Sequence, residues 1–379
     1  MESREKVASI YDLMPKSTEK LLTSSGKDFI EKIGIDVIRE VVYNVLCGGN
    51  LRDSTEMITR RRIGLLNAST FMMFLKGSIN NKKFAKKLPN FSAEELKKKP
   101  RKEKRWVLEW LLGLTDKAFQ NVLRDKADEI DKYAKKYVGE IEQIVALCEK
   151  DYGKVSGIVK LKDGQQVEVD WNFIIQLLGT IGAQTLAIRG SEKSTYGKLF
   201  ERLILGSVLT LLGFRLVSKE NITDFDKVFW LSERKEKRES DATALIRAGQ
   251  GVRFDIGFIG RGNPEISLDK VSRFEREIEL GKQKHYMATF ILVDRIGERS
   301  RIVELAKRID ASVIQMSMSY WAKLLALELK KKLKYESELT SVPDAEISKY
   351  LREKLAKVNI TKFMSNEIID EETTLEDFS

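Results

Sequence analysis

The spacing of apolar residues changes near residue 152, and this change most constrains how the chain can fold. Before it, apolar residues recur at intervals of three and four, which is typical of amphipathic helices. After it, runs such as "VRFDIGFIG" and "MATFILVD" are short and rich in β-branched and aromatic residues, which indicates strands. We therefore expect a helical N-terminal domain at 1–150 and a sheet-containing domain at 151–379.

The N-terminal pattern predicts four helical stretches. Their limits follow from glycine, proline and capping residues. The expected stretches are 26–50, ending at Gly48 and Gly49; 60–77, beginning with three arginines; 92–114, opened by a capping box from Ser92 to Glu95 and broken at Pro100; and a long helix after Thr115.

The second half predicts a mixed sheet flanked by helices. Alternation about Asp163 and Gly164 indicates a hairpin, whereas 171–190 is apolar and its secondary structure is left open. Beyond these, the predicted order is helix, three strands, helix, strand, helix, strand, which defines an α/β (α+β) fold. We expect strands at 227–231, 239–246, 252–260, 287–294 and 311–317, intervening helices at 267–283 and 298–309, and closing helices at 320–333 and 345–358.

The charge balance favours a polyanionic partner. The chain of 379 residues holds 67 basic and 57 acidic residues, a net charge of +10. The last 14 residues carry six acids and no base, so the rest of the chain is more basic than the total suggests. We expect nucleic acid before membrane, because we find no apolar run of the roughly 18 residues that a span requires and no signal peptide.

The few histidines and cysteines exclude several kinds of site. One histidine, His285, rules out a multi-histidine zinc centre and makes a Ser-His-Asp triad improbable. Cys47 and Cys148 lie in helical patterns, as expected of buried free thiols in a reducing, cytoplasmic compartment. A metal in this chain should have oxygen ligands, which points to Mg²⁺, with Mn²⁺ as a substitute.

Two aspartates interrupt the apolar strand patterns. Asp241 opens one predicted strand and Asp255 lies inside the next, where an uncompensated charge is costly. If these strands are antiparallel neighbours, the two carboxylates face each other about 5 Å apart. With Glu201 from the preceding helix they would form a Mg²⁺ site suited to phosphodiester cleavage.

The stretches "YGKLFERLI", "ESDATALI" and "RFDIGFIGRGNPEISLDKVSRFERE" resemble the PD-(D/E)XK nuclease superfamily, and in particular its type II restriction endonucleases. The resemblance covers about residues 195–318 and implies an αβββαβ core. It implies that Asp241 and Asp255 hold the metal and that Glu201 supports them.

The sequence departs from the superfamily pattern at two positions. Ser240 replaces the proline before the first aspartate, and Gly257 stands where the superfamily has its lysine. The resemblance implies that this lysine helps to position or activate the attacking water. Lys270 is the first candidate to supply the missing charge, and Arg253, on the same face of its strand as Asp255, is the second.

DNA contacts are predicted on two segments. Arg60, Arg61 and Arg62 are candidates for the DNA backbone, and the cluster 97–105 is equally compatible with a solvated helix face. Arg261 and Asn263, near the predicted active strand, are candidates for base reading.

The resemblance therefore implies a Mg²⁺-dependent enzyme that cuts double-stranded DNA at a specific short sequence. A palindromic target predicts a homodimer, and the same biological system should contain a cognate DNA methyltransferase. Two alternatives stay open at this point: a repair or recombination nuclease on the same core, and a non-catalytic DNA-binding protein that kept the fold. The helical domain at 1–150 is expected to serve DNA recognition, dimerisation or both.

Overall fold

The protein divides into two compact units. The structure, a computed structural model, describes residues 9–22, 26–123, 126–218, 225–232, 240–258, 286–296, 306–307 and 310–364. Unit 1 consists of Met1–Ser24 and Thr59–Glu192, and unit 2 consists of Ser25–Ile58 and Lys193–Ser379. The predicted functional boundary at residue 150 stays a prediction.

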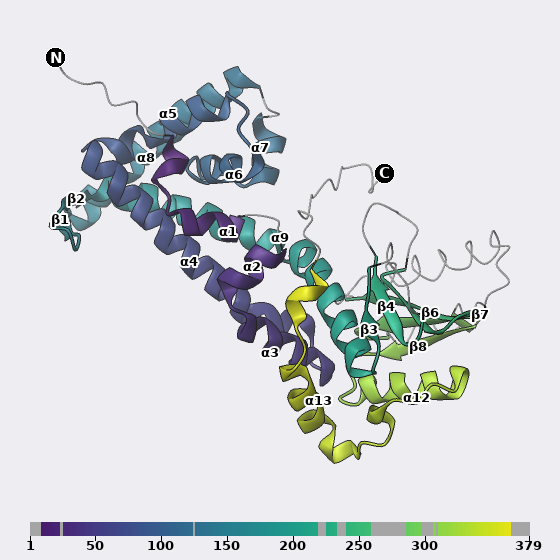
Figure 1. The fold of residues 1–379 in the computed structure, drawn as a ribbon. Helices are drawn as coiled ribbons and strands as arrows, with labels where there is room; N and C mark the ends of the chain where they lie inside the picture. Colours follow the sequence, from purple (N-terminus) through teal and green to yellow (C-terminus); the bar gives the residue numbers. More distant parts are fainter. Residues whose placement is uncertain are drawn as a thin grey trace. The chain divides into compact units, whose positions relative to one another are not determined.

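Unit 1 is built mainly from helices, as the apolar spacing predicts (Figure 1). Its core contains edge-to-face pairs of aromatic rings: Phe74 lies 5.6 Å from Phe173 and 6.4 Å from Phe84 between ring centroids. The helices assigned wholly or partly to unit 1 are α1 (Glu19–Leu22), α4 (Leu51–Asn80), α5 (Phe84–Leu96), α6 (Lys102–Trp110), α7 (Asp116–Leu123), α8 (Ala127–Tyr152) and α9 (Trp171–Leu211).

Several predicted helix limits in unit 1 are wrong and two are confirmed. The helix predicted to begin at Arg60 begins at Leu51, and the long helix predicted after Thr115 is divided into α7 and α8. Ser92 does not open a helix, because α5 begins at Phe84 and continues through Pro89. The buried Ser92 hydroxyl donates to the Leu88 carbonyl 2.9 Å away instead. The break at Pro100 and the cap at Thr115 are confirmed, since α5 ends before this proline and the Ala118 N–H donates to the Thr115 hydroxyl.

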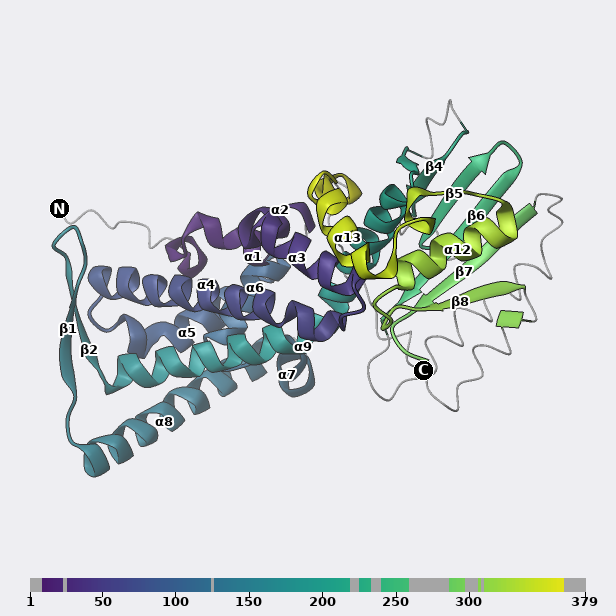
Figure 2. The ribbon, with the colours of Figure 1, turned by 90° about the horizontal axis from the view of Figure 1, so that it is seen from below.

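The hairpin about Gly164 is confirmed as β1 (Ser156–Lys160) and β2 (Gln166–Asp170), which pair antiparallel. Gly164 has a φ of +87°, a turn conformation that glycine adopts without strain. The ambiguous run 171–190 is helical and belongs to α9, which lies beside α4 in unit 1 (Figure 2).

The first half of α9 corrects the expectation that no apolar segment is long enough to span a bilayer. Trp171–Ser191 is long and apolar enough to span a bilayer, and 33% of this apolar stretch is buried inside the protein. Its buried side contains Gln184, which accepts a hydrogen bond from Thr70 and donates one to Asn67, both on α4. These buried polar contacts identify that side of the helix as part of a protein core.

Unit 2 contains the predicted mixed sheet, with strand order β3-β4-β5-β6-β7-β8 (Figures 1 and 2). Strands β4 to β6 pair antiparallel, and β6 to β8 pair parallel, as do β3 and β4. The five predicted strands are confirmed, whereas β3 was not predicted. The bounds are β3 (Arg215–Leu216), β4 (Val228–Leu231), β5 (Ala242–Arg247), β6 (Gln250–Gly257), β7 (Tyr286–Val293) and β8 (Ala311–Gln315).

Unit 2 also contains several helices. The predicted helix over 26–50 is interrupted at Gly34, where φ is +105°, and the predicted closing helices are confirmed. The predicted helix at 267–283 lies outside the described residues, and only residues 306–307 of the one at 298–309 are described as helical. The helices are α2 (Gly26–Ile33), α3 (Ile35–Leu46), α12 (Trp321–Leu333), α13 (Ile347–Ala356) and the second part of α9.

The two faces of the sheet have different surroundings. Phe254 on β6 stacks on Phe290 of β7 at 5.7 Å, and both rings are fully buried. On this first face α12 lies over β8, where the Ser312 hydroxyl donates to Glu328. Side chains alternate along a strand, so Asp255 points to the second face, together with Ile291 on β7.

Candidate active site

The structure brings Asp241 and Asp255 together at one edge of the sheet. Ala242 of β5 lies opposite Phe254 of β6 in an antiparallel pair, so the same register places Asp241 opposite Asp255. The Asp241 carboxylate (Oδ2) accepts the backbone N–H of Ile256 at 2.8 Å. The cross-strand pairing expected from the sequence is therefore present, and a hydrogen bond fixes the Asp241 carboxylate beside Asp255.

Asp255 is a buried acid. Its residue is only 6% exposed, and its strand neighbours Phe254 and Ile256 are fully buried on the opposite face. A carboxylate in such a place requires a compensating charge or hydrogen bonds. A bound cation is one such compensation.

The start of β5 is anchored by neighbouring residues. The Ser232 N–H donates to the Asp241 carbonyl at 3.1 Å, and the Ser232 hydroxyl donates to the Ser240 carbonyl. The Ser240 hydroxyl contacts the Thr243 hydroxyl at 3.1 Å. Hydrogen bonds of Ser240 therefore help to fix the turn before β5.

Glu201 belongs to α9, and its neighbour links this helix to the same edge of the sheet. The Arg202 guanidinium donates to the Ser232 carbonyl at 2.6 Å and to the Phe363 carbonyl at 3.0 Å. Because Ser232 also donates to the Asp241 carbonyl, α9 reaches the site one residue away from Glu201. The supporting role of Glu201 stays a prediction.

Gly257 lies at the end of β6, where the resemblance to the nuclease superfamily predicts a lysine. Arg253 is half-buried and lies on the same face as Asp255, opposite Thr243 on β5 and Thr289 on β7. Among the residues predicted from sequence, Lys270, Arg261 and Asn263 lie outside the described residues.

The three arginines of α4 differ in exposure. Arg60 and Arg61 are exposed. Arg62 is only 6% exposed, and its Nε donates to the Leu21 carbonyl at 3.1 Å. Arg62 therefore helps to hold unit 1 together, and a DNA contact is proposed below for Arg60 and Arg61 alone.

The basic cluster at 97–105 is partly engaged in ion pairs within unit 1. Lys97 pairs with Glu94 and Asp131, and Lys104 pairs with Glu95 at 2.9 Å. These contacts leave fewer of its charges to meet a polyanion than the sequence suggests.

Asp294 follows β7 at the same edge of the sheet and was not predicted as a site residue. Its N–H donates to the Gly257 carbonyl at 3.3 Å, and its carboxylate accepts the Asn50 amide at 2.9 Å. Burial raises the pKa of Asp294, and the negative charge of Asp53 raises it further, against the lowering effect of Arg295. The signal was present, because an acid follows directly after a continuous apolar strand.

The carboxylates of Asp241 and Asp255 suit a cation that takes few protein ligands. Among the described residues, no group of three or more His, Cys, Asp or Glu side chains is arranged to hold a metal. Mg²⁺ is commonly held by one or two carboxylates, with water and substrate phosphate filling the other positions. Asp241 and Asp255 match this donor set.

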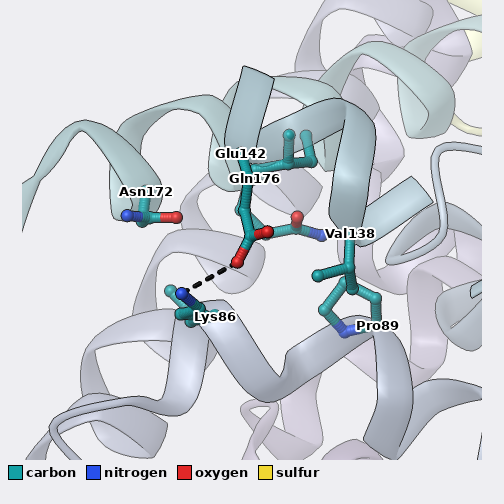
Figure 3. Close-up of a pocket in the computed structure, with 8 residues that line it drawn as sticks. Lys86, Pro89, Val138, Glu142, Asn172 and Gln176 are labelled. Carbon is teal, nitrogen blue, oxygen red and sulfur yellow. Dashed lines mark ion pairs between the residues drawn. The ribbon is translucent and has the colours of Figure 1, made fainter. Parts of the chain in front are cut away.

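A small hollow in unit 1 offers no competing site. It lies between α5, α8 and α9, and the ion pair of Lys86 with Glu142, 2.8 Å long, crosses it (Figure 3). Its volume of about 10 Å³ holds about one water molecule.

Comparisons with known proteins point to one family. The family described as CfrBI restriction endonuclease matches residues 35–301. The type II restriction enzyme CfrBI of Citrobacter freundii is 41% identical to this chain over 357 residues, which cover 92% of the chain and 97% of that relative. No solved structure matches the chain.

Proposed function

Because the chain belongs to the CfrBI restriction endonuclease family, we propose that it cuts double-stranded DNA at one short sequence by hydrolysis that depends on a divalent cation. A restriction endonuclease is a site-specific deoxyribonuclease, so family membership disfavours the repair nuclease and the non-catalytic binding protein as alternatives. The observation that supports the chemistry is the juxtaposition of Asp241 and Asp255, with Asp241 fixed by the Ile256 N–H.

In the proposed site, Asp241 and Asp255 hold Mg²⁺, for which Mn²⁺ can substitute. A cation bound there supplies a water of lowered pKa and neutralises charge on the scissile phosphate. The chain's own contribution is geometric. Asp241 is held by its hydrogen bond and Asp255 by its buried strand, so neither carboxylate has to reorganise when DNA binds.

The positive charge that positions the attacking water is assigned to Lys270 or Arg253. Arg253 already lies on the face of Asp255, two residues earlier on β6. Lys270 follows the strand in sequence at a greater distance. Separate Lys270→Ala and Arg253→Ala variants decide between them, because loss of the water-positioning charge lowers the cleavage rate while DNA binding is retained.

DNA contacts are proposed on two segments of the chain. Arg60 and Arg61 on α4 would neutralise phosphates, while Arg261 and Asn263 would read bases. Glu201 would support the metal ligands. The enzyme is proposed to act as a homodimer on a two-fold DNA site, beside a cognate methyltransferase that protects the host's own DNA.

A cleavage experiment tests the proposal. Purified protein is incubated with a plasmid of known sequence, with Mg²⁺ or with EDTA, beside an Asp255→Asn variant and an Asp344→Asn control. Discrete fragments that require Mg²⁺ and Asp255, with the control active, are the expected result. DNA binding without cleavage by the intact protein under every divalent cation tested would overturn it.

A further inference from the structure

One side of α9 in unit 1 presents an apolar stripe to solvent. Phe173, Gln176, Thr180, Ala183, Gln184 and Ile188 form the buried side of this helix. On the opposite side Leu178 is 57% and Leu186 is 69% exposed, and Gly182 lies between them. No charged residue occurs from Trp171 to Ile188. This stripe is therefore unsuited to phosphate and suited to another apolar surface.

The stripe has the spacing of a helix–helix seam. Its central line holds positions 171, 175, 178, 182, 185 and 189, with alternating steps of four and three residues, and Leu186 flanks this line. Such steps place side chains along one line of a helix, where a second helix can interdigitate with them.

The stripe is also symmetric about residue 180. In an antiparallel pair of two α9 helices centred there, Leu178 of one chain meets Gly182 of the other, and Ile175 meets Thr185. A Cβ added at Gly182 would have no atom within 4 Å in its own chain, so this glycine leaves a gap that faces outward. Leu178 supplies a side chain of suitable size for that gap.

The two ends of the stripe carry opposite charges. Asp170 is exposed at one end, where its carboxylate accepts the Phe173 N–H at 2.8 Å, and Arg189 is exposed at the other. The same antiparallel pairing places Arg189 of each chain near Asp170 and the Trp171 ring of the other, twice by symmetry. An isologous contact of a second copy is complementary in both shape and charge.

The apolar area suits a dimer of ordinary size. Tyr152 is 76% exposed and lies beside Trp171, with ring centroids 6.3 Å apart, so it extends the stripe. Counting roughly 100 Å² for an aliphatic and 200 Å² for an aromatic side chain, the stripe exposes about 300–400 Å². A standard interface uses about 800 Å² per partner, of which about 450 Å² is apolar.

We propose that the Trp171–Arg189 stripe of α9 is the dimer interface, and that it pairs antiparallel with α9 of a second copy about a two-fold axis that passes between Leu178 and Gly182. The inference rests on the proposed function, because cutting both strands of a two-fold DNA site within one complex uses two copies of the Asp241–Asp255 pair. A membrane fits the stripe less well, because the other side of this helix is buried and hydrogen-bonded within unit 1.

The test measures mass without DNA or metal, so it is independent of cleavage. Sedimentation velocity of the full chain at micromolar concentration should show a dimer. Leu178→Glu should weaken it by roughly 100-fold, because the carboxylate would be buried at the axis without a partner. Arg189→Glu should weaken it by roughly tenfold at low salt. Leu327→Glu, at a residue 42% exposed on α12, is the matched control and should leave it unchanged.

Thermal melts establish that each variant folds. A wild-type chain that stays monomeric, or a dimer that Leu178→Glu leaves intact, would overturn the interface. Binding of the monomer to phosphatidylcholine vesicles would overturn it too and identify the stripe as a lipid contact. A dimer without nuclease activity would support the interface and refute the proposed function. A monomer with nuclease activity would support the proposed function and refute the interface.

Discussion

Replacing Asp241 by asparagine and by alanine separates its two roles. The Asp241 carboxylate accepts the N–H of Ile256, a residue that is fully buried. Asparagine keeps an oxygen that can accept this hydrogen bond, while alanine leaves the buried N–H without it. Both substitutions remove the negative charge that a cation requires.

The expected magnitudes differ accordingly. An unsatisfied buried donor costs about 1–3 kcal/mol, so Asp241→Ala should lower the stability of unit 2 by that amount. For a unit of roughly 200 residues this corresponds to a fall in Tm of about 3–10 °C. Asp241→Asn should cost under about 1 kcal/mol, and both variants should lose cleavage by at least about 100-fold.

Differential scanning calorimetry and timed cleavage of a defined duplex measure the two effects. Asp344→Asn makes the same chemical change at an exposed residue of unit 2. It removes an ion pair with Lys323, which should cost under about 1 kcal/mol, and it should leave cleavage unchanged. An Asp241→Asn variant that cuts DNA at the wild-type rate would refute the metal role. Equal melting temperatures for the alanine and asparagine variants would refute the structural role of the hydrogen bond.

Three further predictions concern other parts of the chain. Burial raises the pKa of Asp294, so folding favours its protonated form. Its contribution to stability therefore declines as pH rises from the ordinary pKa of 3.8 through the raised one. Asp294→Asn should remove this decline from thermal melts recorded across that pH range, and an unchanged pH profile would contradict it. Gly206→Ala would place a Cβ 2.4 Å from the Phe363 ring, costing about 1–3 kcal/mol in urea unfolding, and an unaltered midpoint would refute that packing. Arg61→Ala should reduce the slope of log DNA affinity against log salt concentration by about 0.9, with little effect on stability. Arg62→Ala should lower the melting temperature, because Arg62 is buried. An Arg62→Ala variant with the wild-type melting temperature and a reduced salt slope would contradict this.

The strands and the acid pair could be predicted from sequence because each leaves a local signal. An aspartate in an apolar strand is conspicuous, and alternation fixes which residues share a face. The turn between β5 and β6 is short, so the register that brings Asp241 opposite Asp255 follows almost directly from the positions of the two strands. The burial of Arg62 and the Arg202 hydrogen bond that links α9 to this edge of the sheet emerged only from the structure.

Signals that depend on tertiary context were misread or missed. The Ser92 to Glu95 spacing also occurs inside a helix, where Glu95 instead accepts hydrogen bonds from Ser9 and the Ile10 N–H. The apolar run 171–190 has no charged residue before Arg189, and its polar residues Gln176, Thr180 and Gln184 lie on the buried side of the helix. Its helical state depends on contacts such as the Thr70–Gln184 hydrogen bond, which joins residues 114 positions apart.

The claim that Asp241 and Asp255 hold a divalent cation is tested most directly by measuring cation binding. Titration with Mn²⁺, followed by electron paramagnetic resonance in the presence of uncut duplex DNA, counts the ions bound per chain. We expect about one or two tightly bound ions in the wild type. Asp241→Asn and Asp255→Asn should lose both tight binding and cleavage. Variants that bind Mn²⁺ like the wild type and still cut DNA would contradict it.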